Sequence, residues 1–203
     1  MLTSVRFLWF LFLVLSVSIA HRVNDSFIAL YLKELGAPET FIGWSWLLAA
    51  ASEIPVFFLL GRYGGRCKPL LLLSLAALFY TLRFYLMSAI QEPFGIALIQ
   101  LLHGLSYGIF LLTALSYIQE LVPDEFRATR QSVFTVVWAG LAGLIGGIAG
   151  GYIFSHLGYV PLYRISSILA LCAASGFLGT QLYTDWKKTR TVSHIKAYYD
   201  HDM

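Results

Sequence analysis

Long apolar stretches alternate along this chain with short connections that contain polar residues, glycine or proline. The apolar stretches cover about residues 4–33, 40–60, 69–90, 94–122, 128–156 and 161–183, and a polar tail follows over 184–203. Each stretch has at least the roughly 20 residues that an α-helix needs to cross a bilayer. The pattern therefore predicts an all-α membrane protein in which six transmembrane helices form one bundle.

Composition supports this class. The chain has 203 residues, of which 58% are hydrophobic and only 12% are charged. A soluble domain carries about 25% charged residues. The apolar stretches are continuous, whereas a membrane β-barrel would show short segments of alternating polarity. A helical membrane protein is the class that remains.

No pattern in the chain points to an enzyme. Cys67 and Cys172 are far apart, with no spacing typical of a disulfide framework or a metal site. The sequence has no glycine-rich phosphate loop, no HExxH and no GxSxG. We expect no catalytic residues, no cofactor and no metal. The net charge of +3 needs no nucleic-acid partner, because basic residues beside membrane helices mostly set orientation.

Basic residues predict how the bundle is oriented. Six spans place both termini on one side. Most Lys and Arg at the ends of the spans or beyond them fall on that side: Arg6, Arg62, Arg66, Lys68, Arg127, Arg130, Lys187, Lys188, Arg190 and Lys196. The other side has Lys33 and Arg164. The positive-inside rule then predicts a multi-pass protein of the plasma (inner) membrane with cytoplasmic N and C termini. The alternative, a signal peptide cleaved after Ala20, would leave five spans and spoil this agreement.

Several polar side chains lie within the predicted spans. Gln100, His103 and Tyr107 share one helix face, at offsets of three and seven residues. Arg83 stays protonated and needs a carboxylate or cavity water, and Asp25 and Glu53 are the carboxylates available. A charge at the bilayer centre costs roughly 2.5–3.5 kcal/mol on insertion scales, so such residues usually mark a solute or proton pathway. We predict that a pathway for solute and protons is lined by Asp25, Glu53, Arg83, Gln100, His103 and Tyr107.

Structural roles remain as alternatives for the same residues. His21 and Arg22 are candidates to anchor a kink in the first helix, and Asp25 to bond locally to Arg22 or Ser26. Glu53 is a candidate for a structural partner of a neighbouring helix, Arg83 for a structural counter-ion and His103 for a core histidine whose hydrogen bonds are satisfied. Glycines repeat along the fifth span at Gly140, Gly143, Gly147 and Gly151, with a second pair at Gly146 and Gly150. We interpret these glycines as helix-packing positions.

Four stretches carry a resemblance to a known family. They are YLKELGAPETFIGW, ASEIPVFFLLGRYGGR, LLHGLSYGIF and ELVPDEFRATRQS. Together the chain resembles the C-terminal six-helix half of a major facilitator superfamily transporter, of the lactose-permease-like and nucleoside–proton-symporter-like subgroup. The resemblance implies two six-helix halves with the substrate site between them. It also implies roles in proton and sugar coupling for Arg83 and His103, which match the family's arginine and histidine by helix and depth.

Two departures from the lactose permease pattern limit that implication. The permease has a glutamate one turn after the histidine, where this chain has Ser106 and Tyr107. Its glutamate on the second helix of the half is not matched in place by Glu53, which lies nearer the inner loop. Sugar specificity and the same protonation route therefore do not carry over.

Taken together, these patterns favour half of a proton-coupled secondary transporter for a small polar or organic-acid solute. Its expected partners are the lipid bilayer, the solute, the proton and a second six-helix half or a second copy of the chain. The alternative is a truncated or remnant membrane protein without transport activity that acts at most as an assembly partner. An intramembrane enzyme is a third hypothesis, which lacks a nucleophile–base or metal motif.

Overall fold

The computed structural model describes the backbone of residues 4–201 and the side chains of residues 4–190. Eight α-helices make up most of this part of the chain: α1 Val5–Glu34, α2 Glu39–Tyr63, α3 Pro69–Ala89, α4 Pro93–Ile99, α5 Ile109–Leu121, α6 Arg127–Thr135, α7 Ala142–Leu157 and α8 Tyr159–His201. Two π-helical segments, η2 Gly104–Gly108 and η4 Val136–Leu141, lie within the fourth and fifth spans. Short 3₁₀ turns occur at η1 Gly64–Arg66 and η3 Asp124–Phe126.

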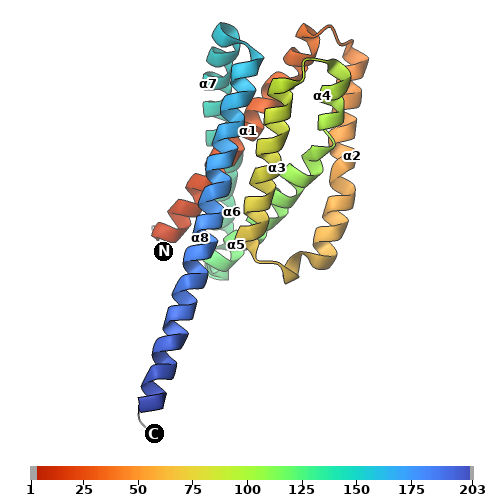
Figure 1. Cartoon of the computed structure of the whole chain (residues 1–203). Helices are drawn as coiled ribbons and strands as arrows, with labels where there is room; N and C mark the ends of the chain where they lie inside the picture. Colours follow the sequence, from red (N-terminus) through yellow and green to blue (C-terminus); the bar gives the residue numbers. More distant parts are fainter. Residues whose placement is uncertain (1–3, 202–203) are drawn as a thin grey trace.

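These elements form six stretches that are long and apolar enough to cross a membrane: Val5–Glu34, Glu39–Arg66, Pro69–Ala89, Pro93–Leu121, Asp124–Leu157 and Tyr159–Arg190. The predicted all-helical class with six long apolar helices is confirmed. Over the predicted polar tail of residues 184–203, the structure continues α8 as far as His201. Residues 184–201 contain no glycine or proline to end the helix. Figure 1 shows α8 extending beyond the bundle at the end where the N-terminus lies.

Glycine and proline set the boundaries between spans. Gly36 has φ of +82° directly after α1, and Gly158 has φ of +80° between α7 and α8. Both adopt the left-handed conformation that glycine takes without steric cost. Pro69 and Pro93 occupy the first turns of α3 and α4, where the missing N–H has no partner to lose. Short connections therefore join consecutive spans.

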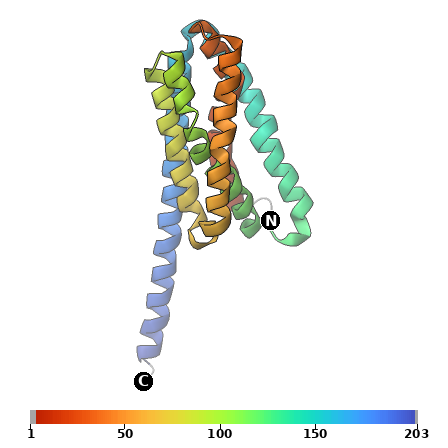
Figure 2. The same ribbon diagram turned by 90° about the vertical axis from the view of Figure 1, so that its right-hand side faces the viewer.

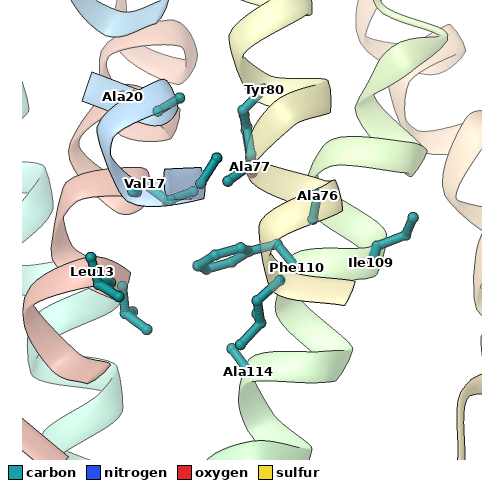
Figure 3. Close-up of a cluster of buried hydrophobic side chains, with 14 of the residues drawn as sticks. Leu13, Val17, Ala20, Ala76, Ala77, Tyr80, Ile109, Phe110 and Ala114 are labelled. Carbon is teal, nitrogen blue, oxygen red and sulfur yellow. The ribbon is translucent and has the colours of Figure 1, made fainter. Parts of the chain in front are cut away.

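The core forms where α1, α3, α5 and α8 meet. Figure 3 shows part of this cluster, in which side chains of α1, α3 and α5 converge: Leu13, Val17, Ala20, Ala76, Ala77, Tyr80, Ile109, Phe110 and Ala114. The α3–α8 interface is the most extensive in the described part of the chain. Small side chains such as Ala76 and Ala77 are fully buried, so the helix backbones approach closely there.

Glycines of the fifth span fall into two groups with different environments. A Cβ at Gly146 would lie 3.2 Å from the Ile19 carbonyl oxygen, and one at Gly150 would lie 2.7 Å from the Phe27 ring. These two glycines therefore let α7 pack closely against α1. A Cβ at Gly140, Gly143 or Gly147 would have nothing within 4 Å. Most of the longer predicted glycine face therefore makes no packing contact within the described chain.

Two spans contribute little to the core. In the most apolar window of the span that contains α2, only 17% of the residues are buried, and the value for the span with α6 and α7 is 28%. The corresponding value for α1 is 67%. Figure 1 shows α2 (orange) at one edge of the bundle, and Figure 2 shows the α6–α7 span (teal) at an edge as well. Broad surfaces of these two spans are left without partners in the chain.

Candidate functional site

A completely buried arginine lies at the centre of the polar site. Arg83 on α3 donates from Nη1 to His103 Nδ1 at 2.9 Å and from Nη2 to the side-chain oxygen of Gln100. Neither of the carboxylates available in the sequence, Asp25 or Glu53, pairs with it directly. Two neutral acceptors therefore replace the counter-ion expected for a buried guanidinium. Its Nε–H has no acceptor among the residues that the structure describes.

The contact with Arg83 fixes the role of each nitrogen of His103. An arginine N–H can only donate, so His103 Nδ1 accepts, and the proton of the neutral ring is on Nε2. That nitrogen lies 3.2 Å from Glu53 Oε1. Arg83, His103 and Glu53 thus form a continuous chain of polar contacts from α3 to α2, which we term the α3–α2 relay.

A glycine makes the α2 end of this relay possible. The Gly104 N–H donates to Ser52 Oγ at 2.8 Å. A Cβ at Gly104 would lie only 2.1 Å from the Ser52 carbonyl oxygen, a distance that no side chain can accept. The fourth span therefore touches the backbone of α2 at this point, beside Glu53. In that position the Glu53 carboxylate reaches His103.

A second cluster of similar chemistry lies on α1. The Tyr80 hydroxyl is 3.2 Å from His21 Nδ1, and His21 Nε2 is 3.3 Å from Asp25 Oδ2. The Arg22 guanidinium reaches the same carboxylate oxygen at 3.4 Å. His21 is buried, whereas Arg22 and Asp25 are partly exposed. We term His21, Arg22, Asp25 and Tyr80 the α1 cluster.

Tyr107 joins the two groups. Its ring stacks on His103 with a centroid distance of 4.9 Å and on His21 with a centroid distance of 4.8 Å. The two histidine rings are 5.8 Å apart. Trp138, in the π-helical segment η4, stacks on His21 at 5.3 Å. Because Tyr80 of α3 also contacts His21, residues of four of the six spans meet here, from α1, α3, η2 and η4.

All six residues predicted from the sequence belong to this one region. Arg83, Gln100, His103 and Glu53 are linked by direct contacts, Tyr107 stacks on His103, and Asp25 connects through His21. The prediction did not include His21, Tyr80 or Trp138. His21 was identifiable, because it lies on the same polar stripe of the first helix as Asp25. Tyr80 and Trp138 gave no signal, since aromatic residues in apolar helices mostly pack in cores.

The arrangement separates a buried cation from accessible carboxylates. Arg83 has no exposed surface, while the Asp25 and Glu53 side chains are 25% and 20% exposed. Each carboxylate contacts a buried histidine, Asp25 with His21 and Glu53 with His103. Such pairs can take up and release a proton at the accessible carboxylate. No cluster of three or more His, Cys, Asp or Glu suited to a metal ion occurs in residues 4–190.

These features define an integral, multi-pass helical membrane protein with a polar site inside its bundle. A sequence model described as the MFS_1-like family matches residues 1–165. The chain belongs to this family, which is part of the major facilitator superfamily.

Several proteins that are named as transporters are similar to this chain. The chain is 31% identical to a maltose permease of Geobacillus stearothermophilus over 173 residues, which is 85% of this chain and 43% of that protein. It is 29% identical to sugar efflux transporter A of Dickeya chrysanthemi over 148 residues, or 70% of this chain and 37% of that protein. It is 26% identical to the multi-drug resistance efflux pump PmrA of Streptococcus pneumoniae over 72% of its own length.

The relatives are named as transporters and pumps and not as enzymes. The chain spans less than half the length of each of these three. No solved structure matches it.

Proposed function

We propose that this chain is one half of a proton-coupled secondary active transporter for a small polar or organic-acid solute. It works by alternating access with a second six-helix unit, which is a separate half or a second copy of the chain. The α3–α2 relay carries this proposal. A buried arginine, a histidine and an accessible glutamate in contact within the membrane form a group that binds a proton at one stage of a cycle and releases it at another.

The surfaces of α2 and of the α6–α7 span support a second unit. Both are largely unburied in the chain alone, and Gly140, Gly143 and Gly147 leave one side of the fifth span free of packing contacts. Asp25 and Glu53 are the partly exposed members of the site. Because a charged group facing lipid is costly, a second unit that encloses a water-filled cavity around them lowers that cost. The solute binds in this cavity.

The proposed orientation follows the basic residues. Figure 1 shows the N-terminus, the α2–α3 connection and the extension of α8 at one end of the bundle. Arg62 is in the last turn of α2, and Arg66 and Lys68 are in that connection. The positive-inside rule places this end in the cytoplasm of a cell whose plasma membrane holds the protein.

Transport by reconstituted protein tests the proposal. The chain is placed in vesicles that contain a pH-sensitive dye, and maltose, uridine or benzoate is added under an imposed proton gradient. We expect one solute to accumulate with proton movement, and Arg83→Gln and His103→Ala to abolish both. Arg164→Gln and His156→Ala are matched controls, since both residues are exposed and lie outside the site.

Two results would overturn the proposal. Unchanged uptake in Arg83→Gln and His103→Ala would exclude the relay from the pathway. No uptake, together with no dimer on cross-linking in the membrane and no uptake after co-expression with a six-helix N-terminal half of a relative, would favour the remnant without transport activity.

A further inference from the structure

A groove at the basic end of the bundle lies apart from the polar site. It has a volume of about 470 Å³ and runs between the first turns of α1 and the α8 segment from Gly176 to Thr184, with Leu70 and Tyr117 behind it. Its size falls in the range of roughly 300–1,000 Å³ that is typical of small-molecule sites. Most of its wall is apolar, and none of its residues belongs to the α3–α2 relay or the α1 cluster.

Glycine and tryptophan shape this groove. A Cβ at Gly176 would lie 2.5 Å from a Leu13 methyl group, so α1 and α8 touch there. A Cβ at Gly179, one turn further along α8, would have nothing within 4 Å. Trp9 Nε1 donates to Thr180 Oγ1 at 2.9 Å across the two helices. Gly179 therefore leaves the groove open, and the hydrogen bond from Trp9 to Thr180 holds α1 and α8 together beside it.

Two polar groups at the groove have no partner in the described side chains. Arg6 is exposed and has no carboxylate within ion-pair distance among residues 4–190. The Tyr117 hydroxyl has no hydrogen-bond partner in the same part of the chain, although its ring packs on Phe10. A guanidinium and a phenol hydroxyl are both donors that suit a phosphate oxygen.

The position in the bundle indicates what the groove holds. Arg6 is in the first turn of α1, and Figure 1 shows the N-terminus at the end of the bundle that holds the α2–α3 connection. A tryptophan such as Trp9, three residues after Arg6, is typical of the depth at which lipid headgroups lie. We propose that the groove binds one anionic phospholipid, with an acyl chain between α1 and α8 and its phosphate at Arg6 and Tyr117. Charge complementarity with Arg6 selects an anionic headgroup over a zwitterionic one, and the apolar walls favour a lipid over a soluble phosphate.

Native mass spectrometry of the purified full chain tests this site. The delipidated protein is titrated with phosphatidylglycerol or phosphatidylcholine, and the dissociation constant of the first bound lipid is measured. One basic residue near an anionic membrane surface favours binding by about fivefold. We therefore expect phosphatidylglycerol to bind roughly fivefold more tightly than phosphatidylcholine. Arg6→Gln should remove this preference, and Gly179→Leu should weaken the binding of both lipids severalfold.

Both variants have matched controls. Arg164→Gln removes an exposed charge near the opposite end of α8, and Cys172→Leu adds bulk at an exposed position of the same helix outside the groove. Both should bind lipid as the unchanged protein does. Equal affinity for the two lipids, or a full preference in Arg6→Gln, would exclude a phosphate at Arg6. Unchanged binding in Gly179→Leu would exclude the groove. Circular dichroism confirms that each variant keeps its helical content.

Discussion

The contact between Gly104 and α2 gives the sharpest prediction of the structure. Replacing Gly104 with alanine would put a methyl carbon 2.1 Å from the Ser52 carbonyl oxygen and 3.0 Å from the Glu53 nitrogen. Both neighbours are backbone atoms of α2, so no side chain can rotate away. Ordinary van der Waals contact begins at about 3.4 Å, which means that α2 must move by more than 1 Å. A shift of that size breaks the 3.2 Å contact between His103 and Glu53.

The cost can be bounded from known cases. Forcing an extra methyl group into a packed contact costs about 1–3 kcal/mol, and losing the bond from the Gly104 N–H to Ser52 adds about 0.5–1.5 kcal/mol. Alanine returns up to about 1 kcal/mol as a better helix former. Gly104→Ala should therefore be destabilised by roughly 1–3 kcal/mol. In a chain of this size, 1 kcal/mol shifts the unfolding temperature by about 2–4 °C, so we expect it to fall by about 2–12 °C.

Two other glycines provide the comparison. At Gly143 a Cβ would meet nothing within 4 Å, and at Gly108 it would lie 3.2 Å from the Phe57 side chain, which can adjust. Thermal unfolding in detergent should rank Gly143→Ala as neutral or stabilised, Gly108→Ala as mildly destabilised and Gly104→Ala as the least stable. Equal unfolding temperatures for Gly104→Ala and Gly143→Ala would refute the close approach of α2, and with it the position of Glu53.

Three further substitutions probe the polar site. Arg83→Gln leaves two buried acceptors without their donor and should cost about 1–3 kcal/mol for each, whereas exposed Arg164→Gln should change the unfolding temperature by less than 1 °C. Glu53→Gln keeps an oxygen that accepts a hydrogen bond from histidine, but its side chain cannot ionise. In this variant solute-driven proton movement should be lost while the unfolding temperature is retained. Glu39→Gln, at the exposed start of α2, should preserve both. Tyr80→Phe removes one hydrogen bond, and unfolding measurements should show a loss of about 0.5–1.5 kcal/mol; an unchanged value would mean that this hydroxyl does not support the α1 cluster.

The sequence pattern predicts the helices well, because apolar length alone decides whether a segment can cross a bilayer. It does not show how far α8 runs into the predicted polar tail. Helix formation there needs only the absence of breakers and a stable helix to extend, and α8 continues to His201. The π-helical segments η2 and η4 also gave no signal, since a one-residue change in hydrogen-bond spacing leaves hydrophobic periodicity almost intact.

The sequence indicates candidate site residues where burial of a polar group is costly in itself. Arg83, Gln100 and His103 stand out because each is expensive in an apolar helix. The partner of Arg83 could not be predicted, because any acceptor on any neighbouring helix would satisfy it. The contact between Glu53 and His103 depends on how closely α2 approaches Gly104, which is a property of packing. A glycine in a membrane helix is too common to indicate one such approach.

No carboxylate in residues 4–190 lies within ion-pair distance of Arg83, and this has a consequence for the proposed cycle. If a carboxylate neutralised the guanidinium directly, the charge of Arg83 would have little effect on a proton at His103. Here the positive charge contacts His103 Nδ1, so any proton added to that ring meets the guanidinium at 2.9 Å and is disfavoured. A proton that enters the relay is therefore held at Glu53, the member that is 20% exposed. In the proposed cycle, loading and unloading take place at the surface that would face the second six-helix unit, where movement of that unit would change access to water.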